Sequence, residues 1–321
     1  MSSEISIPEI AQRCDEIRSL LNQYVVGKDS LIELINVALL SDGHILIEGV
    51  PGTAKTTIAK AYAKILGYSF NRVQCAVDTQ PADILGLRIY DQQKGEFVLR
   101  KGPAFANILL IDELNRLNPR TQSAFIEVMS ERQVTIEGDR LSLPSPFFVM
   151  ATQNPYEFEG TFPLIEAQKD RFMYSFTSEY LNPDEELEVL VRLGSGRLDW
   201  EKYFAYLEEH SGKADIFSLR DAVTSVHIEE RVAAYIRDLV VATRSNGDIS
   251  LGASTRASIA FYKGSKAVAA LRGRDFVTPD DVRTIAPNIL QHRMILRREA
   301  EIAGITLESV VSDIIRSVEV P

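Results

Sequence analysis

Cysteine is almost absent from this chain, with only Cys14 and Cys75 among its 321 residues. The two lie far apart and neither belongs to a Cys-x-x-Cys pair, so the pattern argues against a disulfide framework and against a cysteine-ligated zinc site. We expect two reduced thiols, which is typical of a cytosolic protein.

Long apolar runs are missing as well. Runs such as Ile45–Ile47 and Ile108–Ile111 fall far short of the roughly 20 residues that a membrane-spanning helix needs. The first four residues show no basic and apolar segment of the kind that begins a signal peptide. We therefore expect no membrane insertion, no export and a cytoplasmic location.

The sequence also lacks an excess of basic residues. It contains 35 Lys and Arg against 45 Asp and Glu, which gives a formal net charge of −10. Sequence-independent binding to nucleic acid depends mainly on Lys and Arg displacing counterions from phosphates, so nucleic acid is not an expected partner. A local basic channel formed by an oligomer stays open as an alternative.

The pattern of apolar residues predicts an α/β protein. Hydrophobic residues make up 45% of the chain, as in an ordinary globular protein, and its length suffices for about two domains. Residues 8–24 and 31–40 show a helical period. Three short apolar runs follow, Ile45–Ile47, Ile108–Ile111 and Phe147–Ala151. Continuous apolarity in short runs is typical of strands buried on both faces, so we expect a parallel sheet.

The second half of the sequence looks different. Strand signals disappear beyond about Phe176, and the remaining residues predict helices separated by Gly- or Pro-marked turns. One helix start is clear, with Thr278 as its cap and Pro and Asp in the first turn. We predict an α/β core over residues 1–180 and a smaller helical domain over residues 181–321.

A glycine-rich segment follows the first predicted strand. It reads Gly49-Val50-Pro51-Gly52-Thr53-Ala54-Lys55-Thr56 and matches the phosphate-loop pattern GxxxxGK[ST], except that alanine replaces the second required glycine. In such a loop the backbone N–H groups bind phosphate, the lysine reaches the β- and γ-phosphates, and the hydroxyl holds Mg²⁺. Alanine fits position 54 if its backbone is helical, as the start of the following helix would allow, whereas a positive φ would be costly there. A chance glycine-rich turn is the alternative, which the flanking strand and helix disfavour.

This loop sets the predicted ligand. We expect ATP or ADP with Mg²⁺ as cofactor. The predicted nucleotide-binding residues of the loop are Gly49, Pro51, Gly52, Thr53, Ala54, Lys55, Thr56 and Thr57.

Two carboxylates end the second predicted strand, Asp112 and Glu113. Open α/β sheets gather their ligand groups at the carboxyl ends of the strands. In phosphoryl transfer one such acid holds Mg²⁺ and its neighbour positions or deprotonates the attacking water. We assign Asp112 the metal, together with Thr56, and Glu113 the water. Alone the pair is weak evidence, because acids commonly end strands at the surface; together with Lys55 it becomes strong.

Asn154 lies at the end of the third predicted strand, where it would meet the same edge of the sheet. It would orient the attacking water or contact the γ-phosphate. A turn asparagine before Pro155 is the alternative.

The ordered segments GVPGTAKT, ILLIDELNR, ATQNP, EAQKDRF and LGASTRAS resemble the MoxR family of AAA+ ATPases, in the helix-2-insert group, over nearly the whole chain. The resemblance implies an AAA+ core followed by a helical lid. It implies that Lys55 is the Walker A lysine, that Asp112 and Glu113 are the Walker B acids, and that Asn154 is sensor 1.

Three further assignments come from the resemblance alone. Arg171 matches the arginine finger, which reaches the γ-phosphate bound by a neighbouring subunit; the alternative is a surface arginine paired with Asp170. Arg256 matches sensor 2 on the lid, acting in cis or in trans. Val26 lies in a segment similar to the one that contacts adenine, and an ordinary helix-ending Gly27 is its alternative.

Two inserted elements also match the family. Residues 74–98 resemble the helix-2 insert, and residues 133–143 resemble the hairpin before sensor 1, for which the pattern predicts a turn at Gly138-Asp139. In related motors these elements face the central pore or a partner.

The resemblance implies a ring-shaped homo-oligomer, most often a hexamer, that hydrolyses ATP to remodel or activate partner proteins. Such partners include proteins with von Willebrand factor A domains and proteins awaiting a metal or cofactor. A DNA-translocating motor and a nucleotide-gated scaffold without hydrolysis remain alternatives. The acidic net charge disfavours the first, and the presence of both Asp112 and Glu113 disfavours the second.

Overall fold

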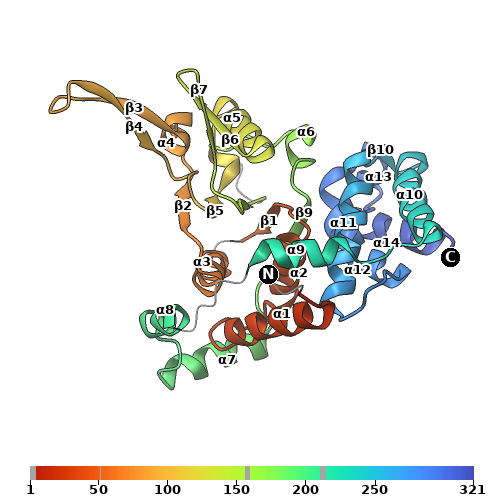
Figure 1. Ribbon diagram of the computed structural model, residues 1–321. Coiled ribbons are helices and arrows are strands. Elements are labelled where there is room, and N and C mark those ends of the chain that lie inside the picture. The colour runs from red at the N-terminus through yellow and green to blue at the C-terminus, as the bar shows by residue number, and fades with distance from the viewer. Residues whose placement is uncertain (1–4, 51, 156–159, 210–214) are drawn as a thin grey trace.

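The computed structural model describes residues 5–50, 52–155, 160–209 and 215–321. At its centre is a five-stranded sheet with the order β2-β5-β8-β1-β9, in which every neighbouring pair is parallel. The strands are β1 (Ile45–Gly49), β2 (Phe70–Gln74), β5 (Ile108–Asp112), β8 (Phe148–Gln153) and β9 (Tyr174–Ser178). The predicted parallel sheet is confirmed (Figure 1).

The two strands that the pattern did not predict, β2 and β9, are the edge strands. An edge strand has a neighbour on one side only, so it needs no continuous apolar run. In β2 only Val73 is fully buried, and its neighbours are polar. The central strands β1, β5 and β8 carry the buried runs on which the prediction rested.

Alternate residues of the central strands enter two different cores. Ile45, Ile108 and Phe148 pack with helices α1 (Ile7–Asn22), α2 (Asp29–Leu40) and α3 (Lys55–Leu66). Leu46 and Leu109 face the other side, where α5 (Pro119–Glu131) covers the sheet. Because successive strand residues point to opposite faces, this apolarity on both faces produces a sheet sandwiched between helices.

Two hairpins project from the core (Figure 1). The first is β3 (Gly86–Asp91) with β4 (Glu96–Lys101), preceded by α4 (Pro81–Leu85), and it occupies much of the predicted insert. The second is β6 (Gln133–Ile136) with β7 (Asp139–Ser142).

The predicted turn of the second hairpin is wrong by one residue. Ile136 pairs with Asp139, so Glu137 and Gly138 form the turn, with φ of 49° and 92°. A two-residue hairpin turn of this kind requires positive φ at both central positions.

Short elements connect the core strands. They are η1 (Leu114–Arg116) and α6 (Glu166–Lys169).

Among the residues described beyond residue 180, helices predominate, and one pair of short strands is the exception. The helices are α7 (Pro183–Gly194), α8 (Trp200–Glu209), α9 (Ile216–Thr224), α10 (Glu230–Ser245), α11 (Thr255–Leu271), α12 (Pro279–Leu290), η2 (Gln291–Arg293), α13 (Arg298–Ile302) and α14 (Leu307–Ser317). The predicted cap at Thr278 is confirmed, because Asp281 closes a capping box with it. The exception is an antiparallel pair, β10 (Ile249–Leu251) with β11 (Ile295–Leu296). Strands of two and three residues are too short to show a periodic pattern.

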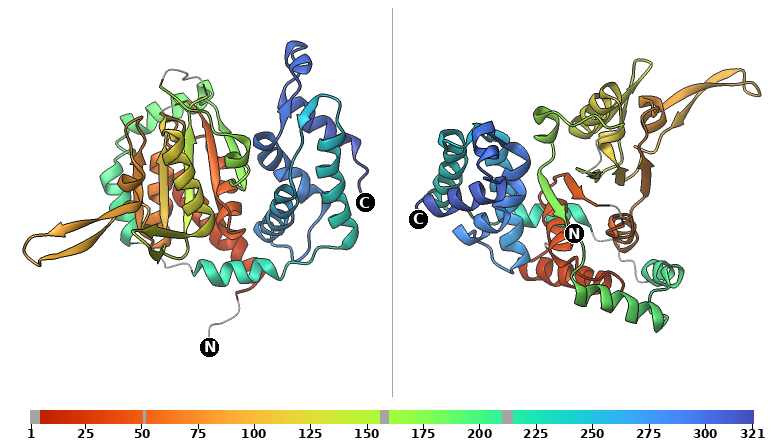
Figure 2. Two further views of the ribbon diagram at one scale, coloured as in Figure 1. Left: turned by 90° about the horizontal axis from the view of Figure 1, so that it is seen from above. Right: turned by 180° about the vertical axis from the view of Figure 1, so that it is seen from behind.

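Helices α7 and α8 lie beside the core rather than among the lid helices α10 to α14 (Figures 1 and 2). Tyr203 of α8 stacks on Tyr24 with ring centroids 3.7 Å apart. Lys60 of α3 lies 4.3 Å from the ring centroid of Phe204. Nowhere in the described parts of the chain does a helix have both the length and the apolarity to cross a bilayer.

A candidate nucleotide-binding site

The phosphate loop connects the end of β1 to the start of α3. Gly49 ends β1 with φ of 143°, and a Cβ atom there would lie 2.3 Å from the Ser178 carbonyl oxygen of β9. Only glycine allows this close approach of the two backbones. Gly52 also has a positive φ, of 83°.

Ala54 does not take a helical conformation. Its φ is 60° and its ψ is 13°, in the left-handed region, and α3 begins one residue later at Lys55. The loop must turn sharply before the helix, and for an alanine this turn costs about 1–2 kcal/mol. The condition under which alanine would fit without cost, a helical backbone, is therefore not met. Pro51, another predicted loop residue, lies outside the described residues.

Lys55 is buried and points into a cavity of about 390 Å³ above the loop. Its Nζ donates to the carbonyl oxygens of Val50 at 2.8 Å and Gly49 at 3.3 Å. Burial lowers the pKa of Lys55, while the nearby carboxylates of Asp112 and Glu113 oppose that shift. Among the described residues, the direct partners of the ammonium are these two carbonyl oxygens, which a phosphate can replace.

The same cavity collects the predicted groups from three strand ends. It is lined by Gly49, Gly52, Thr53, Ala54, Lys55, Thr56, Thr57, Arg72, Gln74, Asp112, Glu113, Thr152, Gln153 and Asn154. The sheet order explains this convergence, because β1, β8 and β5 are adjacent and parallel and so end at one edge. The structure thus brings together Lys55, Thr56, Asp112, Glu113 and Asn154.

A hydroxyl that the sequence analysis missed holds the two acids in place. Thr152 Oγ1, in β8, donates to Asp112 Oδ1 at 2.5 Å and accepts the backbone N–H of Glu113 at 3.0 Å. Arg72 Nη2 lies 2.7 Å from the other carboxylate oxygen of Asp112. Glu113 has φ of 59° and forms an ion pair with Arg116, Nε to Oε2, at 2.7 Å.

The donor set of this cavity fits Mg²⁺. Hard oxygen ligands suit this ion, and the Thr56 hydroxyl and the Asp112 carboxylate line the same space. Mg²⁺ usually binds through one or two such protein groups together with substrate phosphates.

A second cavity, of about 320 Å³, adjoins the first and shares Gly52, Thr53 and Ala54 with it. Val26 lines this second cavity together with aromatic Tyr24 and Trp200. Its apolar and aromatic walls suit a flat base, so the predicted adenine contact is placed beside the phosphate loop.

Lys28 also lines this second cavity, and the sequence analysis missed it. Its Nζ donates to the Glu179 carbonyl oxygen at 2.9 Å. Burial lowers the pKa of Lys28, while Glu185 and Glu179 act in the opposite direction. No local pattern marks this lysine, because residues about 150 positions away in the sequence form its surroundings.

Arg171 and Arg256 do not reach these cavities. Arg171 precedes β9, whose first residue, Tyr174, pairs with Ile45 at the start of β1, whereas Lys55 follows the end of β1. The five residues of β1 span about 16 Å at roughly 3.3 Å per residue. Arg171 and the phosphate loop therefore lie at opposite edges of the sheet, the arginine where the strands begin and the loop where they end.

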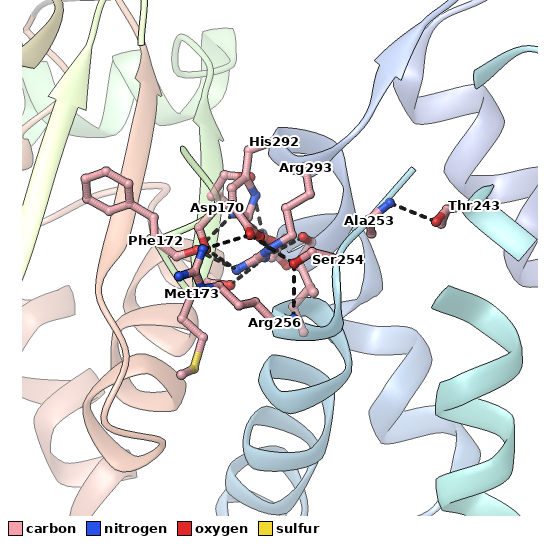
Figure 3. A network of polar contacts seen from close by, with 12 residues as sticks. Asp170, Phe172, Met173, Thr243, Ala253, Ser254, Arg256, His292 and Arg293 are labelled. Atoms are coloured by element: carbon pink, nitrogen blue, oxygen red, sulfur yellow. Dashed lines mark hydrogen bonds and ion pairs between the residues drawn. The ribbon is translucent and has the colours of Figure 1, made fainter. Parts of the chain in front are cut away.

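Asp170 is paired with arginines of the lid rather than with Arg171 (Figure 3). Its Oδ1 accepts from Arg293 Nε at 2.8 Å, and its Oδ2 accepts from Ser254 Oγ at 2.9 Å and from Arg256 Nη1 at 3.3 Å. Arg171 is exposed, and its Nη1 donates to Ser130 Oγ at 3.0 Å. The alternative of an Arg171–Asp170 pair is not observed.

The two lid arginines differ in burial. The side chain of Arg293 is 2% exposed and also donates to the carbonyl oxygens of Phe172 and Met173, so it ties the lid to the start of β9. The side chain of Arg256 is 55% exposed and has one long contact with Asp170. Arg256 can therefore leave Asp170 without leaving that carboxylate unpaired.

Comparison with known proteins identifies the family of the two domains. The family described as "ATPase family associated with various cellular activities (AAA)" matches residues 44–174, and the AAA lid domain matches residues 241–314. The protein YeaC of Bacillus subtilis, which is uncharacterised, is 42% identical over 94% of this chain and 92% of its own length. Chaperone MoxR1 of Mycobacterium tuberculosis is 38% identical over 94% of this chain and 80% of its own length.

A solved structure leads to the same conclusion. A protein from Cytophaga hutchinsonii, described as a candidate ATPase, superposes with a TM-score of 0.88 at 39% identity over 97% of this chain and 96% of its own. From the fold, the phosphate loop and these relatives, this chain belongs to the MoxR family of AAA+ ATPases.

Proposed function

We propose that this protein is a Mg²⁺-dependent ATPase whose active site is completed by a neighbouring copy. The observation that carries the proposal is the cavity in which Lys55, Thr56, Asp112, Glu113 and Asn154 meet. This set comprises a phosphate-binding cation, two metal-directed oxygens, a candidate base and a water-orienting amide. The candidate base Glu113 beside these groups favours hydrolysis over binding alone.

Each side chain has a distinct role in this proposal. The Lys55 ammonium exchanges its carbonyl partners for the β- and γ-phosphate oxygens. Asp112 and Thr56 would hold Mg²⁺, and the ion would supply positive charge to the phosphates. Glu113 accepts a proton from the attacking water, and the Asn154 amide orients that water. The loop and the first turn of α3 offer backbone N–H groups to the remaining phosphate oxygens.

The positions of Arg171 and Arg256 support catalysis in trans. Both lie at the sheet edge opposite Lys55, so neither serves the nucleotide of its own chain without a large rearrangement. If copies assemble head to tail, this edge of one copy faces the phosphate loop of the next. Such heterologous contacts close into a ring when the rotation between copies permits. We propose a homomeric ring, a hexamer by family resemblance, in which both arginines act on the neighbour's γ-phosphate.

We propose that conformational change driven by ATP hydrolysis acts on partner proteins. The β3–β4 hairpin extends away from the core and exposes apolar side chains, with Ile89, Tyr90 and Phe97 40%, 56% and 62% exposed (Figure 1). Tyr90 and Phe97 form an aromatic pair across the two strands, 5.4 Å between centroids. A chaperone-like role fits an exposed apolar hairpin. Clients with von Willebrand factor A domains, or clients that receive a metal or cofactor, are the classes that we propose by resemblance.

We also propose the division into a core of residues 1–180 and a lid of residues 181–321, and a cytoplasmic location.

Replacement of Glu113 tests hydrolysis. We expect Glu113→Gln to bind ATP as the wild type does and to lose roughly 100-fold or more of its turnover, because a general base contributes about 10²–10⁴ to the rate. Phosphate release and ATP affinity, measured on the same preparations, separate the two effects. Glu308→Gln, which changes an exposed acid on α14, is the matched control and should retain wild-type turnover. Equal, measurable turnover in Glu113→Gln and the wild type would contradict the role of Glu113 as base, whereas no hydrolysis by the wild type would favour the nucleotide-gated scaffold.

A further inference from the structure

Helix α7 carries its apolar side chains on the outside. Leu187, Leu190 and Val191 are 59%, 64% and 56% exposed. Spaced three and four residues apart, they form one stripe along the helix, which we call the α7 stripe. The opposite face, with Glu185, Val189 and Arg192 half-buried, attaches the helix to the core, where Arg192 Nη1 donates to the Asn22 carbonyl oxygen at 2.7 Å. A helix that turns its apolar face to solvent has a surface available for a partner.

A groove of about 680 Å³ lies between the end of α2 and the helices α9 and α11, and we call it the lid groove. Its apolar wall includes Phe217, Ile259 and Tyr262, which are 44%, 51% and 45% exposed. The charged residues of its lining are basic by four to two: Arg132, Arg220, Lys263 and Lys266 against Asp42 and Asp221.

The charges of the two surfaces are complementary. The first turn of α7 contains Asp184, Glu185 and Glu186. In the lid groove, Arg132 and Arg220 already share Asp42 as their ion-pair partner. Of the remaining charges, Lys263 and Lys266 outweigh Asp221, so the groove keeps a net positive charge that matches an acidic helix start. Complementary charge of this kind sets the register of an interface and disfavours wrong partners.

Each surface flanks one half of the composite site. Glu186 and Val189 of α7 line the second cavity, on the side of the phosphate loop. Arg256 lies in the first turn of α11, and Ile259 and Lys263 follow at spacings of three and seven residues, on the same face of that helix. An Arg256 that reaches a neighbour's nucleotide therefore brings the lid groove of its own chain up to that neighbour's α7.

We propose that the α7 stripe of one copy docks into the lid groove of a second copy of this chain. The inference rests on the proposed head-to-tail ring and names the surfaces that hold it together. Within one copy, α7 and α9 lie on different sides of α1, so the contact joins copies rather than closing on itself (Figures 1 and 2). Because the stripe and the groove are different surfaces, each copy can dock on one neighbour and accept another.

Thiol cross-linking tests the contact on the full-length chain. Cys14 and Cys75 are buried, and burial raises the pKa of each thiol to about 12, so the background reaction is slow. The variants are Leu190→Cys, Ile259→Cys and the double variant, each treated with a short bismaleimide in the presence of Mg²⁺ and ATP. Both positions are exposed, so the substitutions should leave the fold intact.

The proposal predicts a different product for each sample. The double variant should give a ladder of linked copies, an equal mixture of the two single variants should give dimers only, and each single variant alone should give monomers. Dimers from Leu190→Cys alone would overturn the proposal in favour of α7 packing on α7. Assemblies that light scattering detects but that give no linked products would overturn the α7–groove contact and leave the ring standing. Absence of any assembly would reject the proposed ring together with this contact.

Discussion

Replacing Lys55 with alanine should weaken ATP binding about 100-fold or more and abolish turnover. The ammonium is buried beneath the phosphate site, and its present partners are two backbone carbonyl oxygens. On binding, it would form charge-assisted contacts with the β- and γ-phosphates, each worth about 1.5–3 kcal/mol. Two such contacts correspond to roughly two to four powers of ten in affinity.

Calorimetric titration with ATP and Mg²⁺ measures this loss. Lys60→Ala is the matched control. Lys60 lies on the same helix as Lys55, but its side chain contacts Phe204 and does not line the phosphate cavity. The control should bind ATP with wild-type affinity. Wild-type affinity in Lys55→Ala would refute the assignment of the phosphate loop.

Replacing Arg171 with alanine should leave ATP binding unchanged and lower turnover by about 10³-fold, the lower end of the range that arginine fingers contribute. Its side chain is exposed and lies at the sheet edge opposite the phosphate loop, so it contributes nothing to the nucleotide cavity of its own chain. Its loss should remove charge stabilisation in the transition state only.

Single-turnover hydrolysis and ATP affinity separate these two effects for Arg171→Ala. Arg316→Ala, an exposed arginine near the end of α14, serves as the control and should show wild-type turnover. A loss of affinity equal to the loss of turnover would indicate that Arg171 supports the structure of the binding site instead of acting in the transition state.

The central parts of the fold and the site could be predicted from sequence for a physical reason. The strands β1, β5 and β8 are buried on both faces, so each must be a continuous apolar run. The ends of adjacent parallel strands meet at one edge. Residues that directly follow such runs, such as Asp112 and Asn154, are therefore near each other whatever the connections between the strands.

Other features depend on contacts between distant parts of the chain. The hydroxyl of Thr152 and the guanidinium of Arg72 reach Asp112 from two different neighbouring strands, and no local pattern marks either residue. Lys28 enters the site only because the chain near residues 179–200 folds over it. The left-handed backbone at Ala54 is set by the path of the loop between β1 and α3, which overrides the preference of alanine.

Arg171 and Arg256 show the limit of local reasoning most clearly. Residue chemistry alone gave no reason to connect them, and only family resemblance assigned them to the site. The structure adds their position: Arg171 follows Asp170 in the sequence and Arg256 contacts the Asp170 carboxylate, at the sheet edge opposite Lys55. Their proposed roles, and the domain boundary near residue 180, stay predictions.

Mixing two inactive variants tests the composite site most directly. In a mixed ring, some sites form between an Arg171→Ala copy and a Glu113→Gln copy. Where the first copy supplies Glu113 and the second supplies Arg171, the site contains both intact groups. Random assembly of an equal mixture would make about a quarter of the sites intact, given one heterologous interface per pair of neighbours. We therefore predict ATP turnover well above that of either variant alone. Mixed rings, verified by mass, that hydrolyse no more ATP than the separate variants would contradict catalysis in trans.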